Sequence, residues 1–161
     1  MTHPLVGHTA PEFSLRDQNG RTVSLSQWRG ERVLVVFVPW AFSPVCTYEV
    51  EQLRDASDVQ EAVGAVLVIN CDSRYVNQEW ANLNNFDGLL LSDFWPHGEV
   101  AQAYGVFNEE RGQARRGSFL IDADGVVAWA LESPDGDARD LASYRTALGV
   151  VQGPVETPKP E

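Results

Sequence analysis

The sequence contains few cysteines, which build disulfide scaffolds, and few of the cysteine and histidine residues that form structural metal sites. Its 161 residues include two cysteines, Cys46 and Cys71, and three histidines, His3, His8 and His97. Two cysteines are too few for the disulfide framework of a small secreted domain, and the cysteine and histidine positions match no metal-binding spacing. A Gly-Lys-Ser/Thr phosphate loop is also absent. The sequence therefore predicts neither a metal nor another cofactor.

Basic residues and long apolar stretches are scarce as well. Lysine and arginine number 12 against 23 aspartate and glutamate residues, for a net charge of −11. Nucleic acids and anionic membrane surfaces are therefore unfavourable partners. The longest apolar stretch, residues 33–42, contains Pro39 and is too short to cross a bilayer, and residues 1–10 lack a signal-peptide pattern. We expect a cytoplasmic protein with no nucleic-acid or membrane partner.

The composition is that of an ordinary globular chain. Hydrophobic residues make up 43% and charged residues 22% of the sequence. A chain of this length fits one domain, which we predict for residues 1–149. Residues 150–161 contain Pro, Gly, Glu and Lys and little to bury, so we predict a flexible tail there.

Hydrophobic patterning predicts an α/β protein. Alternating residues on both sides of Asn19-Gly20 predict an N-terminal hairpin, and a second hairpin is predicted around Asp124-Gly125. β-Branched runs predict buried strands, and three- and four-residue apolar spacing predicts helices. This order of elements is typical of a mixed central sheet flanked by helices. The predicted strands span residues 32–38, 65–70, 89–91, 118–122 and 126–130, and the predicted helices span 43–64, 74–83, 99–104 and 138–148.

Cys46 lies where a predicted strand turns into a predicted helix. Reactive groups in such sheets are found at the carboxyl ends of strands. Ser43 is a suitable N-cap and Pro44 suits the first helical position, so Cys46 falls within the first turn. The helix dipole and the unpaired amides of that turn favour a thiolate. This placement indicates a reactive cysteine rather than an inert buried one.

The segment around Cys46 also resembles a known family. Residues 39–46, Pro-Trp-Ala-Phe-Ser-Pro-Val-Cys, resemble the peroxiredoxin signature of Pro, three residues, Thr or Ser, two residues and the peroxidatic cysteine. Residues 6–13 and the Arg-Gly-Ser-Phe of 116–119 resemble two further family segments, and residues 91–108 resemble the one-cysteine alkyl hydroperoxide reductase E type. The resemblance covers roughly residues 5–148. It implies a thioredoxin-like fold with an N-terminal hairpin extension.

The resemblance implies a thiol peroxidase that reduces hydrogen peroxide and organic hydroperoxides. Cys46 would attack the peroxide and become a sulfenic acid. Arg116 would stabilise the thiolate and the developing oxygen charge, Ser43 would offer its hydroxyl to the peroxide, and Pro39 would shield the sulfur. Backbone amides near Val45 and Cys46 would supply further donors. The resemblance also implies a homodimer, which an aromatic-rich turn at residues 94–96 favours as well.

Glu49 and Trp80 match supporting positions of the family. Glu49 matches an acid that pairs with the arginine, but a favourable carboxylate at a helix start is an equally good interpretation. Trp80 matches a tryptophan near that arginine, and a plain core aromatic is at least as good an interpretation. Arg115 would face away from Arg116 on a strand and is expected to be solvated.

Cys71 departs from the family pattern. It does not fall where two-cysteine members place a resolving thiol, and position 49 is Glu rather than the second cysteine of a thioredoxin-type oxidoreductase. We therefore expect an external low-molecular-weight thiol or a redoxin to reduce Cys46. Two alternatives stay open: a two-cysteine peroxidase in which Cys71 resolves, and a non-enzymatic peroxide sensor that uses Cys46.

Overall fold

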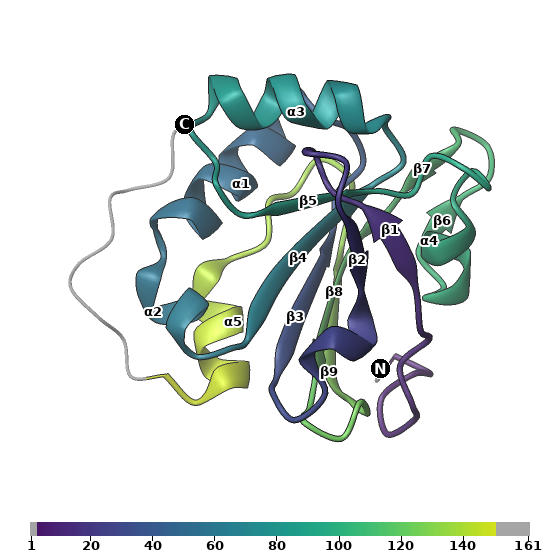
Figure 1. Cartoon of the computed structure of the whole chain (residues 1–161). Coiled ribbons are helices and arrows are strands. Elements are labelled where there is room, and N and C mark those ends of the chain that lie inside the picture. Colours follow the sequence, from purple (N-terminus) through teal and green to yellow (C-terminus); the bar gives the residue numbers. More distant parts are fainter. Residues whose placement is uncertain (1–2, 151–161) are drawn as a thin grey trace.

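The middle of the sheet is formed by two parallel strands, β3 (Val33–Phe37) and β4 (Ala65–Asn70), which confirms the strands predicted there. β4 also pairs in parallel with β5 (Leu89–Ser92), whereas β3 pairs in the antiparallel direction with β8 (Arg116–Ile121). With β1 (Ser14–Arg16), β2 (Thr22–Ser24) and β9 (Val127–Ser133), these strands form a seven-stranded sheet in the order β2-β1-β5-β4-β3-β8-β9 (Figure 1). This computed structural model describes residues 3–150, so the tail predicted at 150–161 lies outside the described residues except for its first residue.

Two hairpins flank the middle strands, as the sequence predicts. β1 (Ser14–Arg16) and β2 (Thr22–Ser24) form the N-terminal hairpin, and β8 and β9 (Val127–Ser133) form the second one. In the first turn, one oxygen of Asp17 accepts the backbone N–H groups of Asn19 and Arg21, and Gly20 adopts the positive φ of 82° that glycine tolerates. The turn therefore occupies five residues, and each strand is shorter than the alternating pattern alone suggests.

The predicted helix over residues 43–64 is two helices. α1 (Pro44–Asp55) ends at Ala56, whose φ of −93° and ψ of 72° are not helical, and α2 (Ser57–Glu61) follows. The side-chain amide of Gln60 donates to the carbonyls of Leu53 and Arg54 at 2.6 and 3.0 Å, and the carbonyl of Leu53 also accepts the backbone N–H of Ala56 at 3.3 Å. The prediction of one continuous helix was therefore wrong, and a side chain from the next helix helps to satisfy the carbonyls at the break.

The last helix also begins later than predicted. α5 (Leu141–Leu148) starts after Asp140, whose carboxylate caps the helix by accepting the N–H of Ala142 at 2.9 Å. The predicted start at residue 138 was wrong for this reason, and Arg139 lies outside the helix. Two further helices, α3 (Arg74–Leu83) and α4 (Glu99–Ala103), agree with the predicted helices, whereas the 3-10 turn η1 (Leu25–Trp28) and the small hairpin of β6 (Phe107–Asn108) and β7 (Gln113–Ala114) were not predicted.

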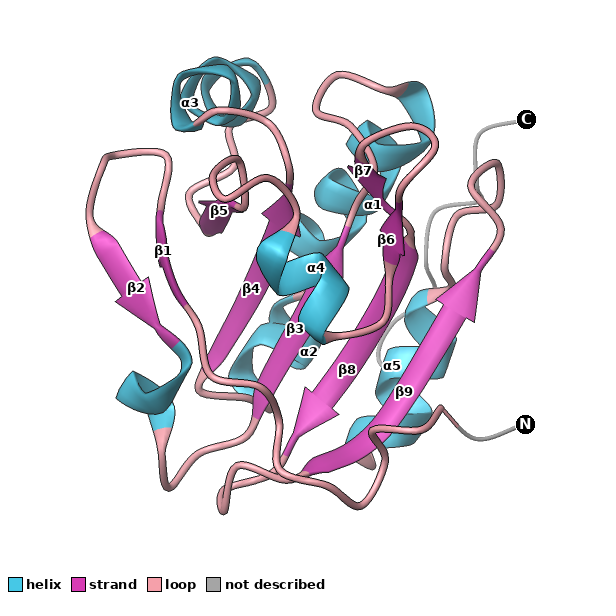
Figure 2. Ribbon diagram, turned by 90° about the vertical axis from the view of Figure 1, so that its right-hand side faces the viewer, coloured by secondary structure: helices cyan, strands magenta, loops and turns pink. Residues whose placement is uncertain are grey.

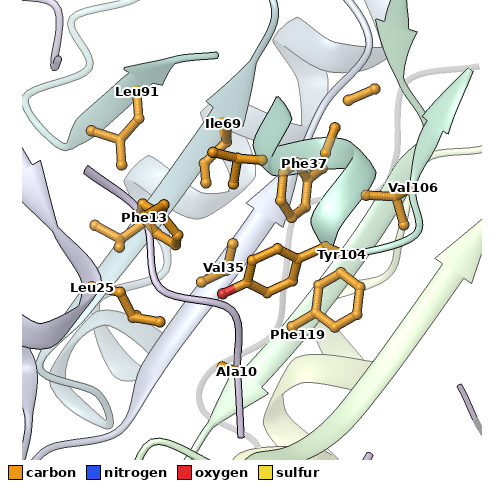
Figure 3. Packing of buried hydrophobic residues seen from close by; sticks show 14 of the residues in the cluster. Ala10, Phe13, Leu25, Val35, Phe37, Ile69, Leu91, Tyr104, Val106 and Phe119 are labelled. Carbon is orange, nitrogen blue, oxygen red and sulfur yellow. The ribbon is translucent and has the colours of Figure 1, made fainter. Parts of the chain in front are cut away.

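The sheet separates two hydrophobic cores. Successive side chains of a strand point to opposite faces, so Val35 and Phe37 of β3 face one core while Leu34 and Val36 face the other. The hairpin-side core lies under the N-terminal hairpin and α4 and contains Phe13, Val35, Phe37, Tyr104 and Phe119 (Figure 3). The helix-side core lies under α1, α2 and α5 on the opposite face (Figure 2) and contains Leu34, Val36, Cys46, Leu53 and Tyr144.

None of the helices within residues 3–150 is long and apolar enough to cross a membrane.

Candidate active site

Cys46 lies in the first turn of α1, immediately after the loop that follows β3. Ser43 is the N-cap, its hydroxyl oxygen accepts the backbone N–H of Cys46 at 3.1 Å, and Pro44 occupies the first helical position. This local geometry confirms the helix start predicted from the sequence. The side chain of Cys46 is fully buried, with 0% of its surface exposed, on the helix-side face of the sheet. A buried sulfur at this place is reached only by a small reactant or after local opening.

Arg116 reaches the sulfur from the neighbouring strand. β8 runs antiparallel to β3 with Val36 opposite Ser118, so the first residue of β8 lies at the edge where β3 ends. The Nη2 of Arg116 lies 3.3 Å from the Sγ of Cys46. Its Nε donates to the carbonyl of Asp135 at 2.7 Å, which fixes the guanidinium plane. The structure thus brings together two of the residues that the sequence singled out.

Glu49 joins Arg116 to a second arginine. One carboxylate oxygen of Glu49 accepts from Nη1 of Arg116 and also from Nη2 of Arg139, the latter at 3.0 Å. The other oxygen accepts from Nε and from the backbone N–H of Arg139, both at 2.8 Å. Glu49 is therefore buried between two guanidinium groups and is more than a carboxylate that favours a helix start.

Arg139 is the main residue of the site that sequence analysis missed. Its side chain is buried and lies in the segment just before α5. Burial opposes its charge, yet the pKa of Arg139 lies above the ordinary value, because the ring of Tyr144, which is ionised at the high pH where an arginine loses its proton, and the hydrogen-bonded carboxylate of Glu49 both favour the charged form. Asp140 was a possible signal, since a cap at this position leaves residue 139 outside the helix and free to contact α1.

The charges of this cluster balance only when the sulfur is ionised. Arg116 and Arg139 contribute two positive charges, and Glu49 contributes one negative charge. A buried uncompensated charge is costly, and a thiolate at Cys46 supplies the missing negative charge. The arrangement therefore presents one unbalanced positive charge to the sulfur, in addition to the start of α1.

The remaining residues singled out from the sequence lie around this cluster. The hydroxyl oxygen of Ser43 accepts the backbone N–H of Cys46, so the O–H hydrogen of Ser43 can still be donated. Because of this bond, the backbone N–H of Cys46, which was expected to donate to the substrate, already has a partner. Pro39 is buried in the loop before α1. Trp80 is buried in the helix-side core with Cys46, and its indole N–H donates to the hydroxyl of Thr47 at 3.1 Å. Arg115 is half exposed, as expected.

A carboxylate that was not predicted fixes the loop before Cys46. Asp72 follows the end of β4, and its Oδ2 accepts the backbone N–H of Ala41 at 2.9 Å. The next residue, Phe42, adopts a φ of 71°, a conformation that non-glycine residues rarely adopt. Burial raises the pKa of Asp72 above its ordinary value. A side chain from the segment after β4 therefore bonds the loop at the residue before its strained position.

Cys71 lies on the other side of the sheet. It continues the alternation of Leu67 and Ile69 in β4, and all three side chains belong to the hairpin-side core. Its side chain is 2% exposed, and burial, with help from the carboxylates of Asp93 and Asp72, raises the pKa of its thiol to about 12. Cys71 is therefore buried, protonated and separated from Cys46 by the sheet.

A buried cysteine at a helix start, held against an arginine, is the arrangement of a thiol-based oxidoreductase. Residues 6–130 match the AhpC/TSA family. The chain is 44% identical to alkyl hydroperoxide reductase E of Mycobacterium tuberculosis (strain ATCC 25618 / H37Rv) over 148 residues, which are 91% of this chain and 97% of the relative. It is 39% identical to peroxiredoxin Bcp of Escherichia coli (strain K12) over 133 residues, or 75% of this chain and 81% of the relative.

Solved structures agree with these relatives. The crystal structure of peroxidoxin BcpB from Mycobacterium tuberculosis superposes with a TM-score of 0.81 at 28% identity and covers 94% of this chain and 100% of that one. The chain therefore belongs to the AhpC/TSA family of peroxiredoxins, as the sequence resemblance indicates. It has a thioredoxin-like fold and is a thiol-dependent peroxidase.

Proposed function

We propose that the chain reduces hydrogen peroxide and organic hydroperoxides through a one-cysteine cycle in which Cys46 is the nucleophile. The observation that carries this proposal is the 3.3 Å contact between Nη2 of Arg116 and Sγ of Cys46, inside a buried cluster that lacks one negative charge. The thiolate attacks the terminal oxygen of the peroxide, and the O–O bond breaks. The sulfur gains that oxygen as a sulfenic acid, and the leaving oxygen takes a proton to become an alcohol or water.

The proposed roles of the neighbouring side chains follow from their contacts. Arg116 stabilises the thiolate and then the charge that develops on the peroxide oxygens. Ser43 donates its free O–H hydrogen to the bound peroxide, and Pro39 shields the sulfur from water. Glu49 and Arg139 hold Arg116 in place. Trp80 supports the first turn of α1 through its bond to the residue after Cys46.

The proposed reductant is an external low-molecular-weight thiol or a redoxin. A resolving cysteine must bring its Cα atom to within roughly 7 Å of the other Cα and must present a thiolate. Cys71 is buried on the opposite face of the sheet, and the raised pKa of its thiol keeps it protonated. The sulfenic acid therefore reacts with a thiol from solution to give a mixed disulfide and water, and a second thiol releases Cys46.

Mass spectrometry under non-reducing conditions tests this cycle. After one equivalent of peroxide, we expect the peptide that contains Cys46 to gain one oxygen, while the peptide that contains Cys71 is unchanged. With excess thiol the protein should turn over repeatedly, and with excess peroxide it should be inactivated as a sulfinic acid. The Cys71→Ala variant is the control and should behave as the native chain does. A linked pair of Cys46 and Cys71 peptides, with the loss of two hydrogens, would show instead that Cys71 resolves.

We also propose that the protein is a homodimer in the cytoplasm, where small thiols are kept reduced. Large apolar side chains are exposed at the site end of the molecule, among them Trp40, Phe42, Phe94 and Trp95, the last with 80% of its surface exposed. Such a group of aromatic side chains favours a protein interface. Light scattering should give about twice the chain mass of 17.8 kDa, and the Trp95→Arg variant should shift the mass towards that of one chain. A native mass of one chain at micromolar concentration would contradict the proposal.

A further inference from the structure

The polar cluster around Cys46 continues beyond Arg139 into the helix-side core. Nη1 of Arg139, the nitrogen that does not contact Glu49, donates to the carbonyl of Gly117 at 2.9 Å and to the hydroxyl oxygen of Ser118 at 3.1 Å. The hydroxyl of Ser118 in turn shares a 2.8 Å hydrogen bond with the hydroxyl of Tyr144 on α5. All these side chains are buried. A continuous chain of polar contacts thus joins the last helix to the sulfur.

Both hydroxyl groups lie on packed elements of the fold. Ser118 lies two residues after Arg116 on β8, so the two side chains share the helix-side face of the sheet. The ring of Tyr144 packs edge-on against Trp129, with 6.0 Å between the ring centroids. Burial raises the pKa of Tyr144, so its hydroxyl stays protonated and adds no charge to the cluster. The two hydroxyls can therefore orient a guanidinium without changing the charge balance of the site.

Building on the proposed role of Cys46, we propose that Ser118 and Tyr144 are positioning residues for the peroxidase reaction. The Arg139 guanidinium donates hydrogen bonds on two sides: Nε and Nη2 donate to Glu49, and Nη1 donates to Ser118. The bond between Nη1 and Ser118 sets the angle at which Nε and Nη2 reach Glu49. Glu49 sets the position of Arg116, and Arg116 contacts the sulfur. Neither hydroxyl touches a reactant; both act through Arg139.

The chain offers a matched pair of variants for the test. Tyr144→Phe removes the hydroxyl that bonds Ser118 and retains the ring. Tyr104→Phe removes the hydroxyl of another buried tyrosine, which donates to the carbonyl of Pro11 at 2.8 Å. Each variant loses one hydrogen bond of a buried tyrosine, so we expect a fall in thermal stability in both. Only Tyr144→Phe is expected to slow the reaction with peroxide, by roughly fivefold, the factor that one neutral hydrogen bond provides.

Two further measurements separate positioning from general destabilisation. The pH profile of the peroxide reaction should move to higher pH in Tyr144→Phe, because a less well placed Arg116 stabilises the thiolate less, and should not move in Tyr104→Phe. The Ser118→Ala variant should be slowed as well. The double variant Ser118→Ala/Tyr144→Phe should be no slower than Ser118→Ala alone, because the two hydroxyls act as one chain.

The outcomes distinguish this inference from the proposed function. Equal rates and pH profiles in Tyr144→Phe, Tyr104→Phe and the native chain would overturn the inference while leaving Cys46 as the nucleophile. Additive effects in the double variant would also overturn it, because independent residues give additive losses. If peroxide did not oxidise Cys46 in the native chain, the proposed function itself would fail, and this result is visible before any variant is made.

Discussion

The Cys46→Ser variant is expected to fold as the native chain does and to reduce no peroxide. A serine hydroxyl is un-ionised near neutral pH and cannot accept the peroxide oxygen, so the loss of turnover should be complete. The fold should survive, because Nη2 of Arg116, now 3.3 Å from the sulfur, can donate to a serine oxygen at nearly the same place. Circular dichroism checks the fold, and peroxide consumption with excess thiol checks the activity.

Cys71→Ala is the control for this experiment. It removes the other thiol, which lies in the hairpin-side core, and should leave the rate of peroxide reduction unchanged. Retained turnover in Cys46→Ser would assign the nucleophile to another residue. Loss of turnover in both variants would show that the reaction needs both thiols and would support the two-cysteine alternative.

The Arg116→Ala variant is expected to lower the rate constant for peroxide by roughly 10²–10³-fold, the usual effect of losing one preorganised donor. The charge balance of the cluster is a second reason to expect a slow reaction in Arg116→Ala. Without Arg116, the single charge of Arg139 is already compensated by Glu49, so a thiolate at Cys46 would be an uncompensated buried charge. Arg116→Lys should recover part of the loss, because an ammonium restores the charge but cannot contact Cys46, Glu49 and the carbonyl of Asp135 together.

Stopped-flow measurement of peroxide reduction checks this prediction, and Arg115→Ala is its control. Arg115 precedes Arg116 in the chain, but its side chain is half exposed and donates to the carbonyl of Gly105, away from the sulfur. Its removal makes the net charge of −11 more negative by the same single unit and should leave the rate unchanged. A rate for Arg116→Ala within about threefold of the native value would reject its role in the transition state.

The parts of the site that depend on local pattern could be predicted from the sequence. A strand followed by Ser43-Pro44 places Cys46 in the first turn of a helix whatever the rest of the chain does, because the cap and the proline act within four residues. The pairing of β3 with β8 could not be predicted from local pattern. The prediction that Arg116 lies near Cys46 came from the family resemblance of residues 116–119, since no local pattern shows that Arg116 lies beside the end of a strand that precedes it by about 80 residues.

The parts that depend on tertiary contacts were missed. Ala56 is a good helix former, so nothing local indicates the end of α1 there; α2 is instead oriented by contacts such as the 2.7 Å ion pair between Asp58 and Arg145 of α5. Arg139 carries no local signal apart from the cap that follows it. The presence of a second positive charge could have been inferred. If Arg116 is paired with Glu49, a thiolate at Cys46 has no positive charge to balance it unless another cation lies nearby.

The placement of Cys71 was accessible by a simple count. Cys71 has the same parity as Leu67 and Ile69 in β4, and it therefore faces the same core as they do. What could not be read from the sequence is which face α1 covers. Without that, the two cysteines, which both follow the carboxyl ends of strands, could equally well have shared a face.

The sheet between the two thiols determines which reactant limits the steady-state rate when peroxide is abundant. In the proposed cycle, an oxidised Cys46 has no second thiol on its own side of the sheet with which to form a disulfide, so each turnover ends only when thiols from solution deliver two electrons. The steady-state rate then follows the supply of thiol rather than the supply of peroxide whenever peroxide arrives faster. In that regime the fraction of oxidised chains measures how depleted the surrounding thiol pool is, and a second peroxide that reaches an oxidised Cys46 removes that chain from the cycle permanently.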